Sequence, residues 1–268
     1  GPQISKILHD PRVKNLSFTG STEVGKHLIR EAADQVIRCS MELGGNAPVI
    51  VLDDANIEKA VSGIILAKMR NGGAACTSAN RIFVQKGIAE EFLAAFTKAM
   101  DAFVMGRGTD EGVTLGAYVS LKERDKIAEL VDEAIKNGAS VRTGGKKPEG
   151  KGAFYPATVM TVDKYNSILK HEIFGPVAPI VIFDTDEEGI ALANDTEFGL
   201  ISYVFSGELG RAIRTAEAME SGMVAINKGV ISDPAAPFGG VKQSGLGREG
   251  GFDGIHEFLE TKYIGFEL

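Results

Sequence analysis

Segments with a helical spacing of hydrophobic residues alternate with short runs of consecutive hydrophobic residues over most of the chain. The clearest helical segment lies near residues 121–137, where hydrophobic residues recur every three or four positions and Gly138 is placed to end the helix. The same spacing predicts further helices near residues 56–70, 88–102, 186–194 and 208–219.

The short hydrophobic runs are typical of strands that are buried on both faces. They lie at residues 49–52, 180–183, 203–205 and 224–226. Strands of this kind that alternate with helices indicate an α/β fold with a parallel-rich sheet flanked by helices.

Composition narrows the class of protein. The chain has 268 residues, 44% of them hydrophobic, and its net charge of −7 is spread along the sequence, which argues against a general affinity for nucleic acid. No hydrophobic run approaches the roughly 20 residues that a membrane span needs. Two cysteines, Cys39 and Cys76, give no disulfide framework and favour a reducing, cytoplasmic location. The four histidines lack the spacing of a zinc site, so we expect no metal.

Cys76 and Glu42 are the candidate chemical groups. Cys76 follows two glycines among small residues, where a flat substrate can approach a nucleophilic sulfur. A thiol must lose its proton before it attacks, and Glu42, on a Gly-Gly turn that would let it swing, could act as the base. Taken alone, such residues are more often a buried structural cysteine and a surface carboxylate.

A glycine-rich stretch follows Pro237. Its Gly245, Gly247 and Gly250 formally satisfy the G-x-G-x-x-G pattern of dinucleotide-binding proteins. The stretch follows a polar turn instead of a strand, so we interpret it as a tight crossover loop.

Five motifs together resemble the aldehyde dehydrogenase superfamily. They are residues 18–25 (FTGSTEVG), 42–45 (ELGG), Cys76, 172–177 (EIFGPV) and 237–240 (PFGG). The chain is similar to the C-terminal part of a family member. The resemblance implies the end of a Rossmann-type cofactor domain at residues 1–43, a catalytic domain at 44–243, and a return segment with an oligomerisation strand at 244–268.

The resemblance also implies roles for individual residues. Cys76 would attack the aldehyde carbonyl to form a thiohemiacetal and then a thioester, with Glu42 as the base. Glu172 and Phe174 would position the nicotinamide ribose and ring. Further cofactor contacts would come from Leu43 and from Gly20 and Ser21, at the start of a helix whose amides face the pyrophosphate of NAD or NADP.

A narrower likeness is to succinate-semialdehyde dehydrogenases. It implies that Arg70 and Ser232 hold the carboxylate of the substrate and that Phe238 lies on the substrate side. An arginine fork suits a carboxylate and favours this role for Arg70. The alternatives are a solvated charge at a helix C-terminus for Arg70 and a turn cap for Ser232.

The leading hypothesis is therefore an NAD(P)-dependent, homo-oligomeric aldehyde dehydrogenase that oxidises a small aldehyde, with succinate semialdehyde as the favoured substrate. Two alternatives stay open. The chain could be a non-catalytic, oligomerising fragment of such an enzyme, or a thiol esterase that uses Cys76 without a cofactor.

Overall fold

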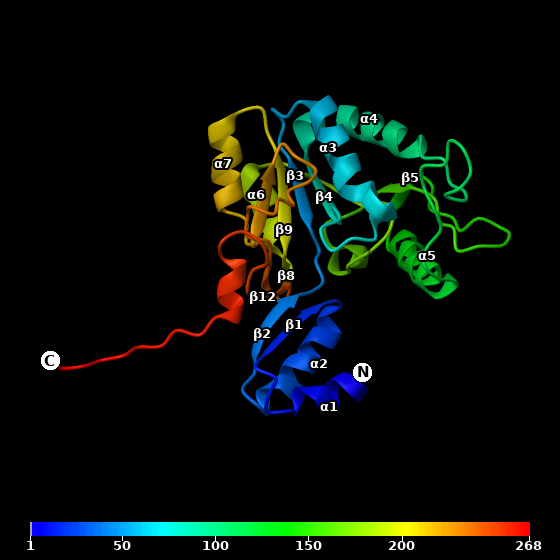
Figure 1. Cartoon of the computed structure of the whole chain (residues 1–268). Helices are drawn as coiled ribbons and strands as arrows, with labels where there is room; N and C mark the ends of the chain where they lie inside the picture. The colour runs from blue at the N-terminus through cyan, green and yellow to red at the C-terminus, as the bar shows by residue number, and fades with distance from the viewer. Residues whose placement is uncertain (1) are drawn as a thin grey trace.

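The computed structural model describes residues 2–268 and contains a large body, a small lobe and an extended C-terminal tail (Figure 1). The large body surrounds a seven-stranded sheet. Its strands, in spatial order, are β10 (Met223–Ile226), β9 (Ile201–Phe205), β3 (Pro48–Val51), β4 (Arg81–Gln85), β7 (Val177–Phe183), β6 (Thr158–Thr161) and β5 (Ser140–Thr143). All neighbouring pairs are parallel except β5 with β6. The predicted α/β fold with a parallel-rich sheet is confirmed.

Helices cover both faces of this sheet. They are α3 (Ile57–Met69), α4 (Ala89–Asp101), α5 (Leu121–Lys136), α6 (Asp186–Asn194) and α7 (Leu209–Glu217). The five predicted helices are thus present, with ends that differ by at most two residues. The chain also contains short 3-10 segments: η1 (Arg70–Gly73), η2 (Lys86–Ile88), η3 (Ser167–Lys170) and η4 (Gly254–Phe258).

Two hydrophobic cores form because successive strand residues point to opposite faces of the sheet. Val49 and Val51 of β3 pack with α3 and α4 in one core. Ile50, on the same strand, packs with α5, α6 and α7 in the other core. Burial on both faces explains why these strands read as continuous hydrophobic runs instead of alternating ones.

The small lobe contains a three-stranded sheet. It consists of β1 (Asn15–Thr19), β2 (Arg38–Glu42) and β12 (Gly245–Leu246), with α1 (Pro2–Leu8) and α2 (Thr22–Ala33) packed beside it. Between β2 and β3 the chain passes from this lobe into the large sheet, and it returns through β12.

The glycine-rich stretch forms this return, as the crossover interpretation predicts. It runs from β11 (Val241–Lys242), which pairs with β8 (Phe198–Gly199), to β12, which pairs antiparallel with β2. Gly245 has φ 146°, and a Cβ on it would lie 2.0 Å from the carbonyl oxygen of Met41, so no larger residue fits there.

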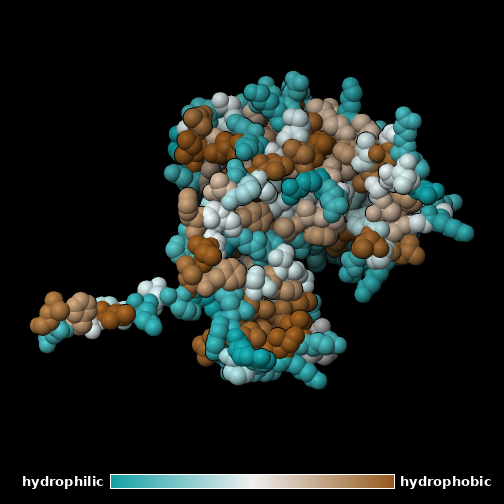
Figure 2. Space-filling view, viewed as in Figure 1, coloured by the Kyte–Doolittle hydropathy of each residue, from teal (hydrophilic) through white to brown (hydrophobic). Residues whose placement is uncertain are grey.

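Apolar side chains remain exposed on the small lobe and along the C-terminal tail, as Figure 2 shows. Ile4 and Ile7 are about half exposed on α1, whereas Tyr263 and Phe266 in the tail are mostly exposed. Within residues 2–268, no helix is both long and apolar enough to cross a membrane.

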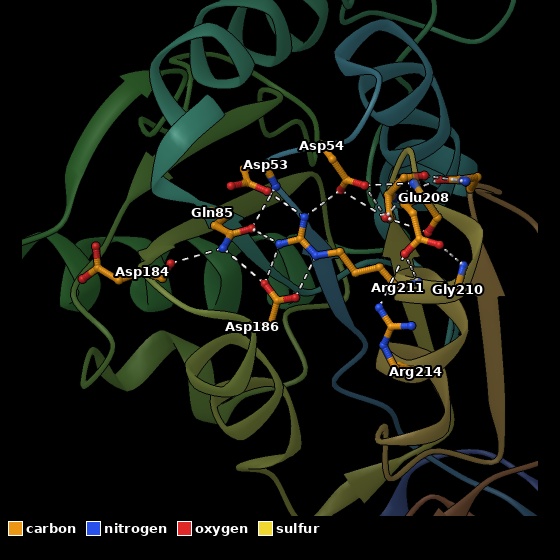
Figure 3. Close-up of polar contacts among 11 residues, drawn as sticks. Asp53, Asp54, Gln85, Asp184, Asp186, Glu208, Gly210, Arg211 and Arg214 are labelled. Atoms are coloured by element: carbon orange, nitrogen blue, oxygen red, sulfur yellow. Dashed lines mark hydrogen bonds and ion pairs between the residues drawn. The ribbon is translucent and has the colours of Figure 1, made fainter.

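Arg211 links four segments of the large body through ion pairs and a hydrogen bond (Figure 3). Its guanidinium contacts Asp53 at 2.7 Å, Asp54 at 3.1 Å and Asp186 at 2.6 Å, and it donates to Gln85 Oε1 at 3.0 Å. These residues come from the loop after β3, the end of β4 and the start of α6, while Arg211 itself lies on α7. The cluster fixes the edge of the sheet where the parallel strands end.

Candidate active site

A cavity of about 1090 Å³ is lined by both the small lobe and the large body. This volume is slightly larger than the roughly 300–1,000 Å³ typical of ligand pockets. Seven of the ten residues predicted for the site line it: Gly20, Ser21, Glu42, Leu43, Cys76, Glu172 and Phe174. The fold therefore brings four separate stretches of sequence to one cavity.

Cys76 lies on the loop that follows α3 and η1. Asn71, Gly72 and Gly73 have φ values of 52°, 61° and 82°, in the left-handed region that favours glycine. A Cβ on Gly73 would lie 2.2 Å from the carbonyl oxygen of Gly175, so this glycine lets the cysteine loop approach the segment that carries Phe174. The half-buried Cys76 packs against the first hydrophobic core.

Glu42 is the last residue of β2 and is only 5% exposed. Its carbonyl oxygen accepts a hydrogen bond from Gly20 N at 3.0 Å, and the residue is in register with Thr19 and Gly245. The expectation that Glu42 swings on a Gly-Gly turn was wrong for its backbone, because the β2 ladder on both sides holds it. Its buried side chain lines the cavity.

The electrostatics of Glu42 and Cys76 suit a base beside a thiol. Burial raises the pKa of Glu42 to about 7, while a hydrogen bond with the Cys76 thiol opposes this rise and the charges of Glu249 and Glu172 add to it. Burial, together with the nearby Glu42 charge, raises the pKa of Cys76 to about 12. The thiol is therefore protonated at neutral pH and needs a base, and a carboxyl with a pKa near 7 is poised to be one.

Glu172 is fixed against the glycines that follow Glu42. Its Oε1 accepts a hydrogen bond from Gly45 N at 3.2 Å, and burial raises its pKa. A Cβ on Gly44 would lie 2.8 Å from Glu172 Oε2, so the glycine makes room for the carboxylate. Phe174, two residues later, has φ 53° and stays 46% exposed at the cavity.

The N-terminus of α2 also opens at the cavity. Ser21 caps this helix by accepting a hydrogen bond from Val24 N at 3.4 Å. Thr22 Oγ1 accepts one from Gly44 N at 3.2 Å, which ties the helix start to the glycines beside Glu42. A helix N-terminus of this length favours an anion, and Glu172 offers a carboxylate for hydroxyl groups. These residues fit a nucleotide cofactor.

A buried amide network, which the sequence reasoning missed, joins the three segments of the site. Asn80 Nδ2 donates to Asn46 Oδ1 at 2.6 Å and to the carbonyl oxygen of His171 at 2.7 Å. Ile173 N in turn donates to Asn80 Oδ1 at 3.0 Å. The one signal in the sequence was the position of these amides, because Asn80 lies directly before one hydrophobic strand and Asn46 lies near the start of another. Amides that become buried there need hydrogen-bond partners.

Three further residues of the site were also missed by the sequence reasoning. Glu249 lies near enough to Glu42 for its charge to raise the pKa of that carboxyl. Tyr118 lines the cavity, and its buried hydroxyl has no hydrogen-bond partner within residues 2–268. Thr77 is buried directly after Cys76.

The three residues predicted to hold the substrate do not line this cavity. Arg70, which follows the last residue of α3, donates to Thr77 Oγ1 at 2.8 Å, one residue after Cys76. Phe238 packs against the same hydrophobic core as Cys76. Ser232 is exposed in an irregular segment between β10 and β11. In the described part of the chain, no group of three or more His, Cys, Asp or Glu side chains could hold a metal ion.

The comparisons with known proteins agree with this geometry. The model of the aldehyde dehydrogenase family matches residues 3–264. The chain belongs to the aldehyde dehydrogenase family. A succinate-semialdehyde dehydrogenase of Paenarthrobacter nicotinovorans is 52% identical over 260 residues, which are 97% of this chain and 58% of the relative. A glutarate-semialdehyde dehydrogenase of Pseudomonas putida is 48% identical over 252 residues, covering 94% and 52% of the two chains.

Solved structures of aldehyde dehydrogenases share the fold of this family member. An NADP-dependent enzyme of Escherichia coli superposes with a TM-score of 0.94 at 45% identity, covering 97% of this chain and 54% of the other. A succinate-semialdehyde dehydrogenase of Burkholderia pseudomallei gives 0.92 at 46% identity, with 95% and 53% coverage. The chain thus spans about half the length of the relatives that it matches.

Proposed function

We propose that the protein oxidises an aldehyde to a carboxylic acid with NAD or NADP, and that its substrate is succinate semialdehyde. The observation that carries this proposal is the placement of the Cys76 thiol beside the buried Glu42 carboxyl, in the wall of the cavity that also holds Glu172. Relatives named as semialdehyde dehydrogenases, some of them as NADP-dependent, support the same assignment.

In this proposal Glu42 accepts the proton of the Cys76 thiol, and the thiolate attacks the carbonyl carbon to form a thiohemiacetal. The backbone amide of Cys76 would donate a hydrogen bond to the resulting oxyanion. Loss of hydride from the thiohemiacetal leaves a thioester on Cys76. Glu42 releases its proton to solvent and then accepts one from the water that hydrolyses the thioester, which frees the acid and the Cys76 thiolate. A bound nicotinamide supplies the hydride acceptor.

The cofactor would be held by the residues that line the cavity on both sides of Glu42. The amides at Gly20 and Ser21 would face the pyrophosphate, while Glu172 would bind the ribose hydroxyls. Phe174 and Leu43 would pack against the nicotinamide. The room that Gly44 leaves for Glu172 supports this arrangement, because it lets the carboxylate lie close to the backbone at the cavity.

The substrate carboxylate is assigned to Arg70. Its guanidinium donates a hydrogen bond to Thr77, the residue that follows Cys76. An arginine can bind a carboxylate through two parallel N–H groups. Ser232 and Phe238 would complete this side of the site. Succinate and glutarate semialdehyde differ by one methylene, which is worth only about 1–3 kcal/mol of discrimination.

Formation of reduced nicotinamide by the 268-residue chain tests the proposal. Succinate semialdehyde is supplied with NAD and then with NADP, and Cys76→Ser is the control. Turnover that the control loses would support the proposal. Full turnover by Cys76→Ser would exclude Cys76 as the nucleophile. Normal folding without turnover would favour the non-catalytic fragment, and ester hydrolysis that ignores nicotinamide would favour the thiol esterase.

The C-terminal tail is proposed to add a strand to a second copy of the chain. In the single chain, residues 259–268 pair with no strand among the described residues, yet they expose Tyr263, Ile264 and Phe266. Deletion of residues 259–268 should therefore lower the mass measured by light scattering to that of a monomer. An unchanged mass would place the interface elsewhere.

A further inference from the structure

Thr77 is held from two sides, directly after the nucleophile. Its side-chain Oγ1 accepts a hydrogen bond from Arg70 Nη2 at 2.8 Å. Its carbonyl oxygen accepts one from Tyr203 Oη at 2.6 Å. Thr77 is 5% exposed and Tyr203 is 2% exposed, so the contact between them lies where water does not compete. The peptide that follows Cys76 is thus fixed, and one of its two anchors is the predicted carboxylate-binding arginine.

Thr77 is the hydrogen-bond partner of the Arg70 guanidinium. Among residues 2–268, this guanidinium makes no ion pair and its only hydrogen bond is the one to Thr77. Arg70 is the first residue of η1, in which Asn71 and Gly72 take left-handed conformations. Its side chain is exposed. A guanidinium carries five N–H donors, so the remaining ones and the whole positive charge stay available to a ligand.

We propose that Thr77 is a positioning residue, whose hydroxyl aims the Arg70 fork at the carboxylate of a carboxylated aldehyde bound to Cys76. The inference rests on the proposed function and adds to it the residue that sets selectivity for charged over neutral aldehydes. The Tyr203 contact anchors the Thr77 backbone, so the hydroxyl has a fixed direction relative to the sulfur.

The physical reason is preorganisation. A long arginine side chain on an exposed connector samples many rotamers, and ordering it when the substrate binds weakens binding. A charge-assisted hydrogen bond to a buried hydroxyl orders one arm of the fork beforehand. The other donors can then meet a carboxylate without that loss.

Alkylation of Cys76 tests this without any cofactor. The probe is 4-bromocrotonate, whose electrophilic carbon is three bonds from its carboxylate carbon, as in succinate semialdehyde, and 4-bromocrotonamide is its uncharged counterpart. The Cys76 sulfur forms a bond to the bromine-bearing carbon, bromide leaves, and the thiol proton passes to the base or to solvent. Mass spectrometry of the Cys76 peptide gives both rates and separates them from Cys39.

Thr77→Val keeps the branched shape and the backbone carbonyl but removes the hydroxyl, whereas Thr77→Ser keeps the hydroxyl and is the matched control. We expect the acid-to-amide rate ratio to fall about tenfold in Thr77→Val, which corresponds to about 1.4 kcal/mol. The ratio should stay within twofold in Thr77→Ser, and the amide rate alone should change little in both variants.

Arg70→Met separates failure of the inference from failure of the proposed function. If Arg70→Met lowers the ratio and Thr77→Val does not, Thr77 does not position Arg70 and the inference is overturned. If Arg70→Met also leaves the ratio unchanged, the carboxylate subsite itself is wrong. Equal loss of both rates in Thr77→Val would reduce Thr77 to a structural residue and overturn the inference as well.

Discussion

The Glu172 carboxylate accepts a hydrogen bond from Gly45 N at 3.2 Å, although the two residues lie 127 positions apart in the chain. The neighbouring Gly44 leaves just enough room for the second carboxylate oxygen. The proposed ribose-binding group is therefore oriented by the backbone that immediately follows the proposed base.

Replacing Gly44 should weaken cofactor binding while the protein still folds. In Gly44→Ala the added Cβ would meet Glu172 Oε2 at 2.8 Å and displace the carboxylate. Loss of a charged hydrogen bond, worth about 1.5–3 kcal/mol, should weaken NADPH or NADH binding at least about tenfold in calorimetry. Gly108→Ala is the control, because its Cβ would meet nothing within 4 Å. Equal affinities in the two variants would contradict the role of Glu172.

Glu42 should control the pH dependence of Cys76 alkylation by iodoacetamide. The carboxylate form exists above its pKa of about 7, so the wild-type rate should rise through that pH. Glu42→Gln should remove the rise and slow the reaction at pH 8 by at least about tenfold, while the exposed Glu111→Gln should change nothing. A faster reaction in Glu42→Gln would show instead that the Glu42 charge suppresses the thiolate.

Lys68 should make the fold more stable as the pH rises above 7. Its side chain is fully buried without a hydrogen-bond partner among residues 2–268, and burial lowers its pKa to about 7 from 10.5. Between these two values the unfolded chain binds the additional proton, so the free energy of unfolding increases with pH. Lys68→Met should flatten this dependence.

The effect of Lys68→Met should be measurable by urea denaturation at pH 7 and pH 9. At pH 7 the variant should gain on the order of 2–4 kcal/mol, since each pKa unit corresponds to about 1.4 kcal/mol. Lys59→Met, on the exposed side of the same helix, is the control. A destabilised Lys68→Met would mean that the ammonium group has a partner in solution.

Loss of Arg211 should destabilise the large body. Arg211→Met leaves Asp53, Asp54 and Asp186 close together without their shared cation, and we expect a loss of about 2–3 kcal/mol in the free energy of unfolding. Arg12→Met, which breaks the exposed pair with Asp10, should cost less than about 1 kcal/mol in the same denaturation experiment. Similar losses in both variants would contradict a structural role for the cluster.

Much of the site could be located from the sequence because its residues occur in motifs whose local geometry depends on nearby residues. Ser21 caps α2, and the glycines before Cys76 turn the chain, as their residue types indicate. The amide network was not predicted, because Asn46 and Asn80 contact each other and His171 only after three distant segments have packed.

Glu42 shows why a local interpretation can fail. The following glycines suggest a mobile turn, yet the residue lies at the end of a strand that is paired on both sides, with β1 and with β12. The partner β12 comes from the far end of the chain, so nothing near Glu42 in the sequence announces it. The same long-range pairing buries the carboxyl and raises its pKa.

The sequence by itself determined the α/β class, the main helices and strands, and the chemical groups of the site, because periodicity, capping and glycine placement act over a few residues. Only the tertiary structure decided how those groups behave. The burial that holds the Cys76 thiol protonated beside Glu42, and the Tyr203 contact that anchors Thr77, depend on segments that lie far apart in the chain.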